Sequence, residues 1–243
     1  IIAKFLNATT IDGYNPYKVT SEGIDWEVIE PENPWSNIGY WGDHQIIYLL
    51  KLLELSHNHY PTALNGMLNE KLFAYANVPY RLKSYDEIVA NPKNSIRFDN
   101  DAHKHILALI PTYGQDARLL RDKNDDVLLA SFTEKLLVTL LAKLSNFIPE
   151  AGIWMNTLRP EWNDANNALV GSGASMVTLY YIRRFVAFLK ELYAESEQTQ
   201  FVNSAEIEAF LNAISTAYEA NKSHLSTGFD NESRRHITDA LGK

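Results

Sequence analysis

Two segments of the chain have the pattern of helices that are apolar on almost every side, and they constrain the fold more than any other feature. In residues 45–58 the polar stripe is limited to Lys51 and Glu54. Residues 173–195 have a similarly narrow stripe, made of Arg183, Arg184, Lys190 and Glu191. A helix of this kind is covered on most of its surface. The sequence therefore predicts that both segments lie inside a larger helical assembly.

The remaining periodic segments complete an all-α prediction. Residues 61–76 and 204–222 have one apolar face, residues 126–147 form a further long helix, and short helices are expected at 85–90 and 102–110. The rest of 77–124, and residues 1–43 apart from a short leading helix, have the composition of loops. No segment alternates strictly between apolar and polar residues. We therefore expect one helical domain over residues 1–243, whose enclosed and one-sided helices form the inner and outer rings of an (α/α) barrel.

The composition excludes several classes of protein. A net charge of −8 without a basic stripe argues against a nucleic-acid partner. Charged residues interrupt every apolar helix, so we expect a soluble chain, cytoplasmic or periplasmic, without a membrane partner. Cysteine is absent, and the acids and imidazoles of residues 98–105 lack the glycine and glutamate that a calcium loop needs. No glycine pattern suits a nucleotide, so we expect no cofactor and no metal.

Two polar, tryptophan-containing clusters precede the enclosed helices. The first, residues 33–45, runs into the helix that begins near residue 45, and the second, residues 159–167, precedes the helix that begins near residue 173. An indole offers a flat apolar face to a sugar ring, and amides and carboxylates hydrogen-bond its hydroxyl groups. Both clusters therefore indicate an oligosaccharide or glycan ligand, and we expect them to lie side by side in one cleft.

The same residues resemble a known family. The run Glu161-Trp162-Asn163-Asp164 is similar to the Asp-Trp-Asn-Asp segment of the cellobiose and chitobiose phosphorylases, and residues 39–45 resemble the substrate-binding entry to an earlier helix of the six-hairpin glycosidase superfamily. The resemblance covers roughly residues 33–54 and 159–193. It implies a six-hairpin barrel. A complete ring needs about twice as many helices as these segments supply, so we expect part of a barrel or a fragment of a larger protein.

The resemblance also implies roles for particular residues. Asp164 corresponds to the general acid, Asp43 to a ligand of the non-reducing sugar, and Glu161 replaces the first aspartate of the family tetrad. In an inverting glycosidase a carboxylic acid of this kind protonates the leaving group. We therefore expect a glycosidase with Asp164 and Glu161 as catalytic residues. The expected substrate-binding residues are Asp43, Trp41, Trp162, Asn163, Arg159, Asn167 and Gln45.

Three alternatives remain open on the sequence alone. Phosphorolysis would use inorganic phosphate in place of water, and a non-catalytic carbohydrate-binding module would keep the aromatic and amide sites but need no catalytic base. No base is evident in the sequence. In the third alternative the clusters only pack loops, with Asp164 and Asp43 capping helices, as aspartate often does.

Overall fold

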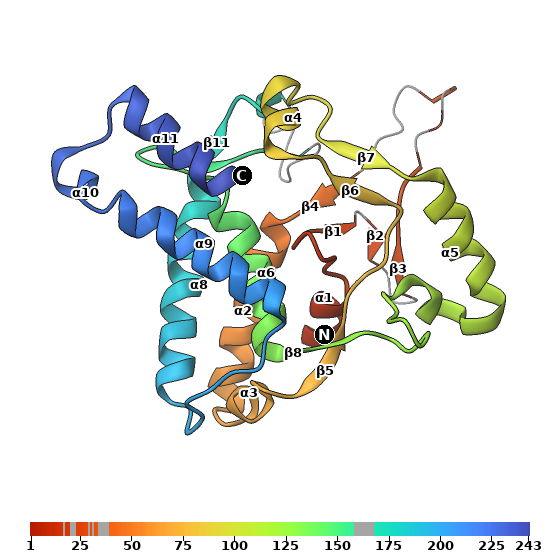
Figure 1. Ribbon diagram of the computed structural model, residues 1–243. Helices are drawn as coiled ribbons and strands as arrows, with labels where there is room; N and C mark the ends of the chain where they lie inside the picture. Colours follow the sequence, from red (N-terminus) through yellow and green to blue (C-terminus); the bar gives the residue numbers. More distant parts are fainter. Residues whose placement is uncertain (17, 20–22, 29, 31, 34–38, 158–167) are drawn as a thin grey trace.

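The computed structural model describes residues 1–243 apart from 17, 20–22, 29, 31, 34–38 and 158–167. About 54% of the described residues are helical, and several small antiparallel sheets accompany the helices (Figure 1). The predicted all-α fold, an (α/α) barrel of the six-hairpin type, is therefore wrong, because the architecture is mixed α/β.

Four long helices pack into one layered core. Helix α6 (Phe132–Leu144) contacts α2 (Asp43–His59), α8 (Met176–Ala194) and α9 (Ala205–Ala220). Helix α9 crosses in front of α6 in Figure 1, and α8 lies beside α2. The short helix α1 (Ile2–Asn7) packs on α2, and the C-terminal helix α11 (Asn231–Gly242) packs on α9.

The most enclosed helix is α6, which the apolar pattern did not single out. Nearly all of its residues are buried, including Glu134, Lys135 and Lys143. Helix α8, predicted to be enclosed, instead exposes a large part of its surface, with Val177 at 51% and Tyr180 at 63%. Apolar content therefore does not predict which helix is central, because α6 buries charged side chains whose partners lie inside the core.

Serine side chains fix where three of the long helices begin. Ser131, Ser175 and Ser204 occupy the N-cap positions of α6, α8 and α9, and each accepts a hydrogen bond from the backbone N–H three residues later. Such a cap satisfies a backbone donor that has no partner within the helix and contributes about 1 kcal/mol.

The described strands are two to four residues long, which is too short for an alternating apolar pattern to predict them. All of the named strands pair antiparallel. The two-stranded pairs are β1 (Asn15–Pro16) with β4 (Tyr40–Trp41), β2 (Lys18–Val19) with β3 (Ile24–Asp25), β5 (Lys71–Ala74) with β8 (Leu129–Ser131), and β6 (Tyr80–Leu82) with β7 (Ile96–Phe98). The three-stranded sheet has β10 (Gly152–Trp154) between β9 (Phe147–Ile148) and β11 (Ala174–Ser175).

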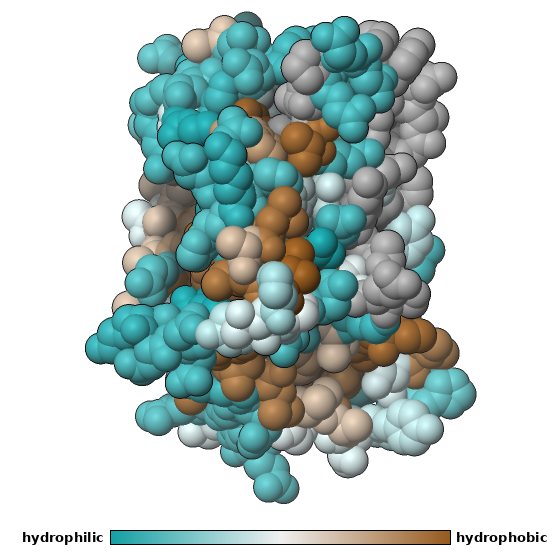
Figure 2. Space-filling view, turned by 90° about the vertical axis from the view of Figure 1, so that its right-hand side faces the viewer, coloured by the Kyte–Doolittle hydropathy of each residue, from teal (hydrophilic) through white to brown (hydrophobic). Residues whose placement is uncertain are grey.

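The shorter helices lie around this core and at its edge. They are α3 (Ala63–Met67), α4 (Tyr85–Ala90), α5 (Asn100–Tyr113), the 3-10 helix η1 (Gly114–Arg118) and α10 (His224–Thr227). The helix predicted at 61–76 is wrong beyond α3, since the chain turns into β5 there. Helix α5 projects at the right-hand edge of the molecule in Figure 1. Figure 2 shows the molecule from that side, with apolar side chains gathered in the middle and lower part of the face. In the described part of the chain, no helix combines the length and apolarity that crossing a membrane requires.

Candidate functional site

Asp43, the predicted sugar ligand, lies in the first turn of α2 and is only 6% exposed. Its Oδ1 is 3.1 Å from Nζ of Lys143, which is 3% exposed and lies on α6. Gly42 makes this approach possible, because a Cβ atom there would be 2.1 Å from Cε of Lys143. Asp43 therefore joins the start of α2 to α6 through a buried ion pair.

Gln45 and Trp41 are placed differently from each other. The Gln45 side chain is buried, and its Nε2 donates to the backbone oxygen of Phe5 and to Oγ1 of Thr9, each at 2.9 Å. Gln45 thus ties α2 to the N-terminal segment. Trp41 is partly exposed and lies on β4, opposite Asn15 of β1. Whether either residue contacts sugar stays a prediction.

The second predicted cluster falls outside the described residues. Arg159, Glu161, Trp162, Asn163, Asp164 and Asn167 all belong to it. The chain before and after that segment is described, and hydrogen bonds join its two sides. Met155 accepts a hydrogen bond from Gly171 N–H at 2.7 Å, and the Trp154 indole N–H donates to the Gly171 carbonyl at 3.1 Å. The described residues that flank segment 158–167 are therefore joined to each other at β10.

Asp43, in the first cluster, and Thr157, which precedes segment 158–167, line one small cavity. Asp43 and Lys143 line it together with Asn156, Thr157 and Ser175. Its volume is about 10 Å³, which has room for one water molecule. Asp43 and Thr157 thus lie near each other, while the predicted proximity of the two clusters, and of Asp43 and Asp164, stays a prediction.

A larger cavity adjoins this one and shares Trp154 and Asn156 with it. Its volume is about 200 Å³, below the roughly 300–1,000 Å³ of a site for a drug-sized ligand. Besides the shared pair, the polar and aromatic side chains of its lining are Asp12, Tyr14, Lys83, Tyr85, Ser145, Asn146 and Phe210. Aromatic rings, amides and a carboxylate are the groups that bind a sugar ring, and we call this space the Trp154 cavity.

Hydrogen bonds fix the amides of the Trp154 cavity. The Tyr14 hydroxyl donates to Oδ1 of Asn156 at 3.1 Å and accepts from Nδ2 of Asn146 at 3.2 Å. The same Tyr14 ring lies 4.8 Å from Nζ of Lys143. The polar lining of the cavity is therefore connected to the buried Asp43–Lys143 pair through one tyrosine.

Asp12 is the carboxylate of the Trp154 cavity. Its Oδ2 accepts hydrogen bonds from the Tyr40 hydroxyl at 2.9 Å and from Leu82 N–H at 3.1 Å. Burial, followed by the charge of Asp12, raises the pKa of Tyr40 well above its usual value. Tyr40 therefore stays protonated and keeps donating to Asp12, which fixes the position of this carboxylate.

Trp154 supplies an aromatic wall whose polar atom is already engaged. Because its indole N–H donates to the Gly171 carbonyl, the ring is held in the lining of the cavity. The Tyr85 ring meets it edge to face at 6.2 Å, and the Tyr85 hydroxyl donates to Asp239 of α11 at 2.7 Å. A ring from α4 and an indole from β10 are thus oriented by separate hydrogen bonds.

The sequence did not identify Asp12, Tyr14, Asn146 or Asn156 as site residues. Asp12 and Tyr14 lie in the N-terminal stretch expected to be loop, and Asn146 follows the end of α6. A usable signal was Trp154, which lies five residues before Arg159, where the resemblance to the phosphorylases begins.

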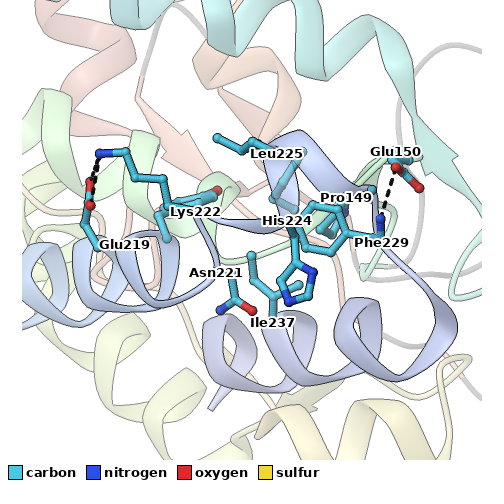
Figure 3. A pocket seen from close by; sticks show the side chains of 12 residues that line it. Pro149, Glu150, Glu219, Asn221, Lys222, His224, Leu225, Phe229 and Ile237 are labelled. Carbon is cyan, nitrogen blue, oxygen red and sulfur yellow. Dashed lines mark hydrogen bonds and ion pairs between the residues drawn. The ribbon is translucent and has the colours of Figure 1, made fainter.

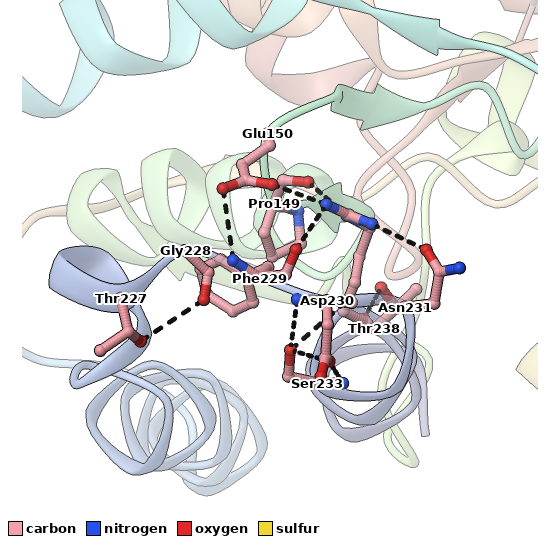
Figure 4. A network of polar contacts seen from close by, with 10 residues as sticks. Pro149, Glu150, Thr227, Gly228, Phe229, Asp230, Asn231, Ser233 and Thr238 are labelled. Carbon is pink, nitrogen blue, oxygen red and sulfur yellow. Dashed lines mark hydrogen bonds and ion pairs between the residues drawn. The ribbon is translucent and has the colours of Figure 1, made fainter.

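A third cavity, of about 330 Å³, lies between α9, α10, α11 and the turn after β9. Figure 3 shows His224, Leu225, Phe229 and Ile237 around it. Its charged groups are already paired: Lys222 with Glu219 at 3.1 Å, and Arg234, which lies behind the turn, with Glu150 at 2.6 Å. Figure 4 shows that the second pair belongs to a network that closes the turn at Pro149 and Glu150 against the start of α11. These features suit a structural contact better than a sugar site.

No family model matches the chain, and no curated protein matches it. Within the described residues no group of three or more histidines and carboxylates could hold a metal ion. The function therefore has to be argued from the site itself.

Proposed function

We propose that the protein binds a glycan and cleaves its glycosidic bond by inversion, with Asp164 as the general acid. The observation that carries the proposal is that the described residues on either side of segment 158–167 are joined at Trp154, Met155 and Gly171, beside a cavity whose lining suits a sugar ring. The sequence resemblance of residues 161–164 supplies the role of Asp164, and Glu161 is the next candidate for the general acid.

In this proposal one sugar ring occupies the Trp154 cavity. Its apolar face lies on the Trp154 indole, and its hydroxyl groups exchange hydrogen bonds with Asn146, Asn156 and Asp12. The cavity volume of about 200 Å³ suits one ring, and the rest of an oligosaccharide extends past the rim. Trp162 provides a further stacking surface, with Asn163, Arg159 and Asn167 as hydrogen-bonding partners.

Inversion also needs a base to activate water on the opposite face of the sugar. Asp43 is a poor choice, because its carboxylate is buried against Lys143. Asp12 is the carboxylate within the lining of the Trp154 cavity and is therefore the first residue to test as the base.

A non-catalytic carbohydrate-binding function is the second candidate. It is favoured by one observation: both aspartates of this region have partners in the described chain, Asp43 through Lys143 and Asp12 through Tyr40 and Leu82. A binding module would keep Trp154 and the amides without any proton transfer.

The test is an activity screen of β- and α-linked oligosaccharides with and without inorganic phosphate, beside a binding screen of the same glycans. Asp164→Asn should lower turnover by about 10²–10⁴ and leave glycan binding intact. Asp126→Asn, at an exposed turn, is the matched control and should be fully active.

The outcomes separate the candidates. Release of a sugar phosphate only when phosphate is present would assign phosphorolysis rather than hydrolysis. Binding without turnover would assign the module, whereas full activity of Asp164→Asn would place the acid elsewhere. If the wild type neither binds nor cleaves any glycan, the proposal fails as a whole.

A further inference from the structure

The largest of the described cavities shares Ile11 with the Trp154 cavity and is otherwise lined by different residues. It has a volume of about 640 Å³ and lies between α6, the start of α9 and the pair β5–β8. Half of its twelve lining residues are aliphatic: Ile11, Leu128, Leu129, Ala130, Val138 and Ile207. A volume of this size accommodates a small organic molecule with a largely apolar body.

One buried carboxylate lies in this aliphatic wall. Glu134 is 8% exposed, and its Oε1 accepts a hydrogen bond from the Tyr75 hydroxyl at 2.8 Å. Its Oε2 accepts from the backbone N–H of Ser204 at 2.6 Å. Each carboxylate oxygen has a second lone pair, so Glu134 can accept further hydrogen bonds from a ligand.

The lining holds two further acceptors besides Glu134, one from Asn203 and one from Glu206. Oδ1 of Asn203 is buried and has no hydrogen-bond partner among the described residues. Glu206, exposed in the first turn of α9, adds a second negative charge, and Lys71 is the one cation of the described lining. A buried acceptor without a partner costs free energy that a donating ligand would recover.

The neighbouring Lys135 does not neutralise Glu134 directly. Its Nζ donates to the Thr9 carbonyl at 3.1 Å and lies 3.6 Å from the centre of the Tyr75 ring. Burial lowers the pKa of Lys135 well below its usual value, and the charge of Glu134 opposes that change only in part. The carboxylate charge is therefore left for a cation that enters the cavity.

We propose that this cavity binds a primary ammonium carried on an aliphatic or small aromatic body. The ammonium group, which has three donors, lies between the Glu134 carboxylate and Oδ1 of Asn203, and the body contacts the leucines and isoleucines of the wall. This site is independent of the glycan function proposed above, so either can fail without the other.

The experiment compares three probes of equal chain length by isothermal titration calorimetry: n-hexylammonium, n-hexanol and n-hexanoate. We expect hexylammonium to bind at one site and hexanol to bind at least about tenfold more weakly, because only the cation recovers the interaction with a buried carboxylate. Hexanoate should not bind. Equal affinity of hexylammonium and hexanol, or no binding of hexylammonium, would overturn the proposal.

Matched variants locate the site. Leu129→Trp fills the cavity from a position that is 47% exposed, and Leu72→Trp, 57% exposed on β5 outside the lining, is its control. Glu206→Gln should weaken hexylammonium severalfold, whereas Glu219→Gln on the same helix should leave its affinity unchanged.

These variants decide the outcome without disturbing Glu134, whose hydrogen bonds also support the fold. Unchanged affinity in Leu129→Trp would show that the ligand binds elsewhere and would refute the assignment. If Glu206→Gln and Glu219→Gln weakened hexylammonium binding equally, the attraction would come from the net charge of the protein and not from this cavity. That result would also refute the proposal.

Discussion

At the scale of single residues, the protein buries charges on α6 and satisfies each in a different way. Lys143 is paired with Asp43, Glu134 accepts two hydrogen bonds, and Lys135 donates to a backbone carbonyl. A buried charge that lost its partner would cost several kcal/mol. The partners of these three side chains therefore decide whether α6 can be the central helix.

The burial of Lys135 predicts a specific pH dependence. Its pKa is lowered in the folded protein, so between that pKa and 10.5 the unfolded chain binds more protons and stability rises with pH. Lys135→Met removes this dependence. We compare the free energy of unfolding of the variant with that of the wild type. The difference, variant minus wild type, should fall from pH 7 to about pH 9.5, by no more than about 1.4 kcal/mol per pH unit.

Urea denaturation at several pH values measures this difference, and Lys71→Met, at an exposed lysine, is the control for replacing a lysine by methionine. A constant difference for Lys135→Met across the range would show that Lys135 stays charged when folded.

Gly42 predicts a steric effect at the buried ion pair. A Cβ atom at this position would lie 2.1 Å from Cε and 2.8 Å from Nζ of Lys143, so the lysine would have to leave Asp43. Gly42→Ala should therefore destabilise the fold by about 1–3 kcal/mol. Gly66→Ala is the matched control: nothing lies within 4 Å of its Cβ, and alanine in α3 should be neutral or stabilising by up to about 1 kcal/mol. Equal denaturation midpoints for both variants would contradict this account.

At the scale of elements, a single arginine fastens the C-terminal helix to the β9–β10 hairpin. Nε of Arg234 donates to the Pro149 carbonyl at 3.1 Å, and its Nη2 donates to the Phe229 carbonyl at 3.0 Å and to Glu150 at 2.6 Å (Figure 4). Glu150 has a φ of 61°, in the left-handed region that few residues other than glycine adopt. The hydrogen bonds of Arg234 help to hold this turn.

Arg234→Ala should therefore release α11 from the hairpin. We expect a loss of about 1–3 kcal/mol and faster amide hydrogen exchange in residues 229–242, with α2 and α6 unchanged. Lys222→Ala removes an exposed pair between positions three apart on the chain and should change little. Uniform acceleration of exchange over the whole chain would mean that Arg234 supports global rather than local stability.

The element boundaries show where local patterns are informative. Helices α2, α4, α8 and α9 lie close to the predicted 45–58, 85–90, 173–195 and 204–222, because each has a helical apolar period and most begin at a capping residue. The segment 61–76 has the same period but divides into α3 and β5. There the pairing of Lys71 and Phe73 with β8 competes successfully with helix propensity.

At the scale of the whole molecule, buried tyrosines predict an alkaline transition. Burial is the largest cause that raises the pKa values of Tyr40, Tyr75 and Tyr80, so the folded protein keeps protons that the unfolded chain releases near pH 10. Stability is present below this pH and lost as pH rises above it.

Absorbance at 295 nm should therefore show these tyrosines ionising together with the loss of helical circular dichroism. Gradual ionisation at pH 10 with intact helices would contradict the burial of their hydroxyl groups.

Local period, charge and residue type were enough to predict the long helices, the expectation against nucleic acid and the two polar clusters. The mixed α/β architecture could not be predicted in this way, because strands of two to four residues acquire their hydrogen bonds from distant partners and have no local period. The Trp154 cavity also depends on the packing, because it joins Asp12 and Tyr14 to Asn146 and Trp154, more than a hundred positions away. Proximity between residues more than a hundred positions apart is set by how the helices pack, and no local pattern encodes it.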